Sequence, residues 1–207
     1  MKNYGLIFLL LLAPFILGCA EVPLDVKRFD PVINRTGISR TLLNNEAYAV
    51  FNGVEYKISA ALFSYNTIFA LLIDIQNNTD KNILPGEYSI SLADGRDLKP
   101  IKMLSRQDLM ATKAKYSGGG GGGIQDQLIQ TTMDTVMNMT NVETKQKLVK
   151  VLDQGINAYF SFRPIYAHDQ RQGTLCFLPD FVLEYPITLK VKIGEKAETF
   201  IFYPRKI

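Results

Sequence analysis

The feature that most constrains the fold is a repeat of apolar residues at every second position, which occurs in two separate parts of the chain. In the first part, residues 48–58 and 68–76 alternate in this way, with turn-forming residues between them. In the second part, residues 189–193 and 197–203 do so on either side of a short turn. Because successive side chains of a β-strand point to opposite faces, this spacing predicts half-buried antiparallel strands joined by hairpins.

Six consecutive glycines at residues 118–123 separate the two parts. Such a run cannot pack a core and loses much conformational entropy if it becomes ordered. Residues 124–159 then carry apolar residues at three- and four-residue spacing, which predicts one long helix, or a helix pair divided at the capping-box pattern of residues 140–143. We interpret residues 103–165 as an insertion that holds the glycine linker and these helices, with residues 103–116 as a short helix or irregular segment.

With this insertion set aside, about six to eight strands with turns between them predict a mainly β domain over residues 46–207. The strands at residues 68–78, the strand and turn at residues 88–95 and the closing hairpin at residues 173–202 resemble the immunoglobulin-like sandwiches of bacterial envelope proteins. The resemblance implies an antiparallel β-sandwich interrupted by a helical insertion. The tryptophan and the cysteine pair of antibody domains are missing from this chain.

The first eighteen residues have the pattern of an export signal. Lys2 supplies a positive charge, and residues 6–17 are apolar apart from the break at Pro14. This stretch is too short to span a bilayer, which takes about 20 residues. Gly18 and Cys19 follow this stretch. Residues 16–19 are therefore a branched apolar residue, a tolerant position, a small residue and a cysteine.

This ending resembles the lipobox of bacterial lipoproteins. The resemblance implies cleavage between Gly18 and Cys19, diacylglyceryl transfer to the Cys19 thiol and acylation of the new amino terminus. Two or three acyl chains bind a membrane more firmly than one, since each buried CH₂ contributes about 0.8 kcal/mol. Because Ala20 stands where many enteric inner-membrane lipoproteins have Asp, we expect an outer-membrane anchor facing the periplasm. The alternatives are an ordinary cleaved signal or a short uncleaved anchor.

The assignment of Cys19 to lipid affects how two other parts of the chain are interpreted. Residues 19–45 contain two prolines and scattered charges, so we expect a lipidated N-terminus and tether, with Val32 and Ile33 as an optional edge strand. Cys176 is left without a disulfide partner. Because it lies in an apolar, strand-like run, we expect a buried, inert thiol, with an intermolecular or redox role as the alternative.

No pattern of catalytic or metal-binding residues stands out in the sequence. The one histidine, His168, lies in a polar loop beside Asp169, and no Gly-x-Ser-x-Gly elbow accompanies it. One histidine and one free cysteine make a poor transition-metal site, and the acidic residues lack EF-hand spacing. The glycine run lacks the lysine and hydroxyl residue of a phosphate-binding loop. We therefore predict no catalytic residues, no metal and no cofactor.

The balance of basic and acidic residues argues against nucleic acid as a partner. The chain has 23 basic and 20 acidic residues, which gives no strong field for nucleic acid, and export makes that partner unsuitable. Our leading hypothesis is a non-enzymatic envelope protein that binds another protein or scaffolds an assembly. Met133, Val136 and Met137 form a candidate binding face on the helical stripe, and a sheet edge that accepts a partner strand is the alternative. Two other hypotheses are a helical insertion that binds the bilayer and an unrecognised hydrolase that uses His168.

Overall fold

The computed structural model describes residues 26–33, 37–43, 46–65, 67–95, 97–117 and 142–205. These ranges contain ten strands and two helices, which confirms a mainly β domain with helices. In chain order the elements are β1 (Val26–Val32), β2 (Ile38–Leu43), β3 (Glu46–Asn52), β4 (Tyr56–Tyr65), β5 (Ile68–Asn77), β6 (Tyr88–Asp94), β7 (Pro100–Leu104), α2 (Arg106–Tyr116), α4 (Val142–Asn157), β8 (Gln170–Leu178), β9 (Ile187–Ile193) and β10 (Lys196–Pro204).

The strands close into an eight-stranded antiparallel barrel. The order β1-β10-β9-β6-β7-β8-β5-β4 returns to its start because β1 pairs with both β10 and β4. β3 pairs with the other part of the β4 edge, and β2 pairs with β3. The β2–β3 hairpin is therefore an extension of the closed barrel.

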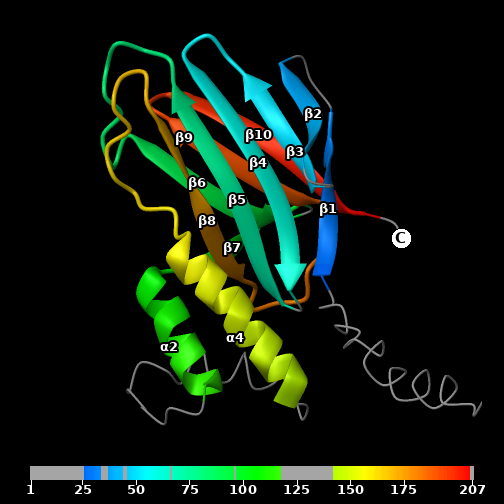
Figure 1. The fold of residues 1–207 in the computed structure, drawn as a ribbon. Helices are drawn as coiled ribbons and strands as arrows, with labels where there is room; N and C mark the ends of the chain where they lie inside the picture. Colours follow the sequence, from blue (N-terminus) through cyan, green and yellow to red (C-terminus); the bar gives the residue numbers. More distant parts are fainter. Residues whose placement is uncertain are drawn as a thin grey trace, which may run out of the picture.

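The barrel is flattened into two layers, with β3, β4 and β5 in front of β6, β9 and β10 (Figure 1). The layers are joined by two strands that change partners along their length. Residues 26–28 of β1 pair with β4 and residues 29–32 with β10, while β7 pairs first with β6 and then with β8. Corner strands of this kind connect two packed layers. The antiparallel layers fit the expected sandwich, but their closure into a barrel differs from an immunoglobulin-like fold.

One hydrophobic core fills the inside of the barrel. β5 contributes Phe69, Leu71, Ile73 and Ile75, all nearly inaccessible to solvent, which confirms the buried face predicted from their spacing. The inner faces of the other strands add further aromatic and branched residues to the same cluster. The period-two pattern therefore identified the inner face of this strand correctly.

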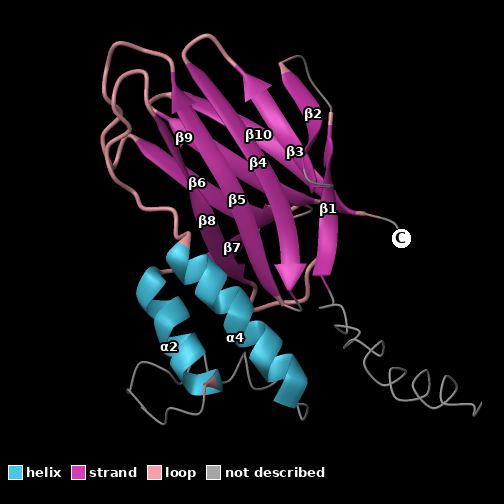
Figure 2. Ribbon diagram, in the orientation of Figure 1, coloured by secondary structure: helices cyan, strands magenta, loops and turns pink. Residues whose placement is uncertain are grey.

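The two helices pack on the outer face of the barrel at one end (Figure 2). Their contact with the strands forms a second apolar cluster, which consists of Ile68, Leu104, Leu109, Leu148, Leu152, Ile156, Cys176 and Leu178. α2 begins with a capping box, since the Ser105 hydroxyl accepts from the Asp108 N–H at 3.1 Å and the Asp108 carboxylate accepts from the Ser105 N–H at 2.8 Å. The expected helix after the capping pattern of residues 140–143 is α4. The glycine run and residues 124–141 lie outside the described residues.

Residues 26–32 and 38–43 differ from the tether that the sequence predicted. They form two strands, and β1 supplies one corner of the barrel. Phe29 is 1% exposed and packs against Phe69, with the two ring centroids 5.5 Å apart. Pro31 fits in β1 because this half of the strand pairs with β10 alone in the described part of the chain. Pro31 and the charged residues Lys27, Arg28 and Asp30, which had suggested a tether, therefore belong to a corner strand.

Candidate functional site

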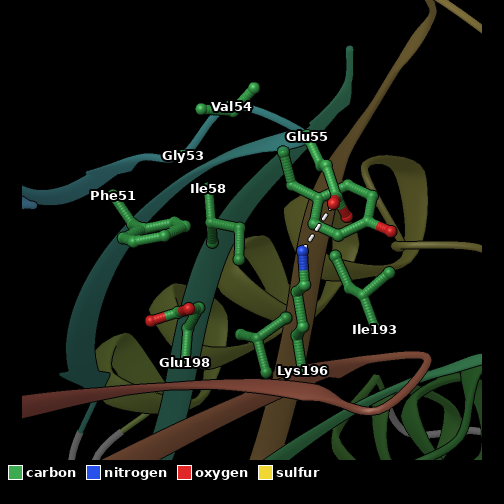
Figure 3. Close-up of a pocket in the computed structure, with 10 residues that line it drawn as sticks. Phe51, Gly53, Val54, Glu55, Ile58, Ile193, Lys196 and Glu198 are labelled. Carbon is green, nitrogen blue, oxygen red and sulfur yellow. Dashed lines mark hydrogen bonds and ion pairs between the residues drawn. The ribbon is translucent and has the colours of Figure 1, made fainter. Parts of the chain in front are cut away.

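The barrel opens at one end between the β3–β4 hairpin and the β9–β10 hairpin (Figure 3). The cavity there has a volume of about 200 Å³. Its floor consists of Ile58, Val191 and Ile193, which come from both layers and are buried. The remaining described lining residues are Phe51, Gly53, Val54, Glu55, Tyr56, Lys196 and Glu198. The opening is therefore an apolar cavity with charged residues around it.

The charged residues reach the mouth because of the alternation in β10. Phe200 and Phe202 belong to the core, so Lys196 and Glu198, at even spacing from them, face the same way. Lys196 Nζ lies 2.5 Å from Glu55 Oε1, and this ion pair joins the two hairpins across the mouth (Figure 3). The hydrogen bond from Lys196 lowers the pKa of the Glu55 carboxyl. The cavity can hold a small apolar group beneath a charged pair, and its described lining includes no serine, cysteine or histidine.

A second candidate is the edge of the sheet at β2, which pairs with β3 alone among the described residues. In an antiparallel ladder, alternate residues direct their backbone groups to opposite sides. The Asn52 N–H donates to the Gly37 carbonyl at 3.2 Å, so Gly37 bonds toward β3. By the same alternation, Ile38, Arg40 and Leu42 direct their N–H and C=O groups away from β3. This edge is a row of backbone donors and acceptors.

Most site residues proposed from the sequence fall outside the described ranges. This applies to Gly18 and Cys19 of the lipobox and to Met133, Val136 and Met137 of the helical binding face. Those assignments stay predictions. Among the described residues, no group of three or more histidine, cysteine or acidic side chains could hold a metal ion.

The two other residues considered from the sequence, His168 and Cys176, differ in their exposure to solvent. His168 is in an exposed loop, with Nε2 2.9 Å from Asp80 Oδ1. Cys176 is 2% exposed beneath the helices, which confirms a buried thiol. Burial raises the pKa of this thiol to about 11, so it is a weak nucleophile near neutral pH.

The sequence did not reveal the barrel mouth, and it indicated a sheet edge as an alternative binding surface without placing that edge at β2. The signal for the mouth was present, because Lys196 and Glu198 continue the every-second-residue spacing of Phe200 and Phe202. The signal for β2 was hidden, since five of its six residues are exposed and the strand lacks a full apolar face.

No family model matches the chain, and no curated protein matches it. In the part of the chain that the structure describes, no helix is long and apolar enough to cross a membrane.

Proposed function

We propose that this protein is a non-enzymatic envelope lipoprotein that binds an extended segment of another protein as an added strand along β2. The observation that carries the proposal is the open edge of β2, since β3 is paired on both sides and the other eight described strands close into the barrel. A lipid on Cys19, expected from the lipobox, would hold the barrel to the membrane.

The backbone N–H and C=O groups along the β2 edge indicate what kind of partner binds there. An unpaired ladder of N–H and C=O groups is complemented by another extended backbone, which is how strand addition binds peptides. Leu42 and Leu43 lie next to these groups and are 64% and 58% exposed. They point to opposite faces of the strand, so a partner strand with apolar residues would cover one leucine on each face.

The proposed anchor also limits where the partner lies. β1 begins at Val26, seven residues after Cys19. Seven residues reach at most about 25 Å when fully extended. The barrel would therefore stay close to the membrane surface, and the partner must present its strand within that distance. This differs from the long tether expected from the sequence.

Site-specific photocrosslinking in the native host tests this proposal. A crosslinking residue at Ser39 or Thr41 lies on exposed β2, and the matched controls at Lys190 and Lys192 lie on exposed positions of β9, which is paired on both edges. We expect the β2 positions to capture one envelope protein and the β9 positions to capture none. Equal capture from both strands, or none from β2, would contradict the proposal.

A further inference from the structure

A groove of about 420 Å³ lies on the outer face of the barrel, beside the C-terminal end of α4. It is separate from the barrel mouth and from the free backbone groups of β2. Its described lining residues are Tyr48, Leu72, Ile73, Asp74, Asn157, Ala158, Tyr159, Gln172, Gly173 and Thr174. In the β5–β8 ladder, Leu72 pairs with Thr174 and Asp74 with Gln172, so these four residues form two adjacent cross-strand pairs.

Asp74 is unusual in this groove because one oxygen of its carboxyl group is buried without a donor. Oδ1 is inaccessible to solvent, and no hydrogen-bond partner is present for it in the described part of the chain. Burial raises the pKa of this carboxyl, and the charge of Lys57 has a smaller opposing effect. Lys57 pairs with Gln76 and Ser59 with Asp74, so the lysine stands diagonally from the carboxylate. A buried acceptor without a donor is unfavourable, and a cation bound where the carboxyl group lines the groove would offset part of that cost.

The other lining residues indicate which donor fits. The amide oxygens of Asn157 and Gln172 are further acceptors, and Tyr48 and Tyr159 supply aromatic rings. Aromatic faces attract cations, and a hydrogen bond between an ammonium and a carboxylate is stronger than one between neutral groups. Asp74 is the only charged side chain in the described lining, which gives the groove a negative charge.

We propose that this groove binds a primary ammonium group carried on a small apolar or aromatic body, with Asp74 as its counter-ion. The ammonium donates to the part of the Asp74 carboxyl group that lines the groove and to a neighbouring amide oxygen. Leu72 and the tyrosine rings contact the apolar body. Lys57 competes for the carboxylate from its diagonal position.

The test is a titration of the full chain with 2-phenylethylammonium and with its uncharged counterpart 2-phenylethanol, followed by backbone amide NMR shifts. We expect the ammonium to move the signals of Asp74, Gln172 and Thr174 and to bind at least tenfold more tightly than the alcohol. Equal affinities, shifts that lie elsewhere, or no binding of the ammonium at about 10 mM would overturn the proposal.

Three variants complete the test. Asp74→Asn preserves the size of the side chain and removes its charge, so we expect at least a tenfold loss of ammonium affinity with no loss of melting temperature. Lys57→Met removes the competing cation and should strengthen binding, which gives a second readout of opposite sign. Asp80→Asn, on an exposed loop away from the groove, is the control and should bind as the native chain does. Unchanged affinity in both Asp74→Asn and Lys57→Met would contradict the role of Asp74.

Discussion

At the scale of single residues, Asn77 shows how one buried amide fixes the loops at one end of the barrel. It is fully buried, and its Nδ2 donates to the carbonyls of Lys81 at 2.7 Å and Tyr166 at 3.1 Å. Its Oδ1 accepts from the N–H of Thr79 at 3.0 Å. One side chain therefore joins the turn after β5 to the loop before β8, about ninety residues further along the chain.

Replacing Asn77 with alanine should lower the free energy of unfolding by roughly 2–4 kcal/mol, because buried carbonyl groups lose their donors. Asn78→Ala is the control, since Asn78 is exposed and its substitution should change stability by less than about 0.5 kcal/mol. Urea unfolding of the two variants measures the difference. Similar losses in both would show that the Asn77 bonds contribute little.

The thiol of Cys176 gives a second prediction at this scale. Burial raises its pKa from 9.0 to about 11, so roughly one thiol in a thousand is ionised at pH 8. We expect iodoacetamide to alkylate the folded chain at least a hundredfold more slowly than the urea-unfolded chain. Because folding favours the neutral thiol, its contribution to stability is present below pH 9 and is lost as the pH rises through 11. Equal alkylation rates would mean that the thiol is accessible.

At the scale of elements, the sequence predicted which side of α4 is buried but not the surface against which that side packs. Leu148, Val151, Leu152 and Ile156 have helical spacing, and all four are buried in α4 as that spacing predicts. The surface that they cover could not be predicted, because the periodicity of a helix identifies its apolar side and not the element against which it packs. The structure places that side against β5, β7, β8 and α2.

Leu152→Ala should lower the free energy of unfolding by about 2–5 kcal/mol, since this side chain is inaccessible to solvent and its loss leaves a cavity under α4. Lys150→Ala on the exposed side of the same helix should have almost no effect. Thermal or urea unfolding provides the comparison. A small effect of Leu152→Ala would show that α4 adds little to the folded domain.

At the scale of the whole molecule, barrel closure was the feature least visible in the sequence. The closing contacts join residues that lie far apart, such as Phe29 and Pro204 in the register of β1 and β10. Local alternation predicts strands but does not encode which strands meet at a corner. The interpretation of residues 19–45 as a tether was wrong for β1 and β2 for the same reason, because their partners lie elsewhere in the chain.

Shortened chains test closure directly. A chain that begins at residue 26 keeps β1 and should unfold in one cooperative transition. A chain that begins at residue 33 lacks β1, which leaves edges of β4 and β10 unpaired and uncovers Phe69. We expect that chain to lose its cooperative transition in circular dichroism or calorimetry. Identical unfolding of the two chains would instead support the tether expected from the sequence.

Strand addition requires that the β2 edge bind its partner through backbone groups. Leu42→Pro removes an N–H that points away from β3, while the exposed side chain takes no part in the core, so the fold should survive. Leu42→Ala keeps the N–H and is the matched control.

The deciding measurement is the amount of the β2-crosslinked envelope partner recovered from cells that carry each variant at equal protein level. We predict at least tenfold lower recovery with Leu42→Pro than with Leu42→Ala, because both variants lose the leucine contact and the proline alone also loses the N–H. Native recovery with Leu42→Pro would contradict strand addition at β2.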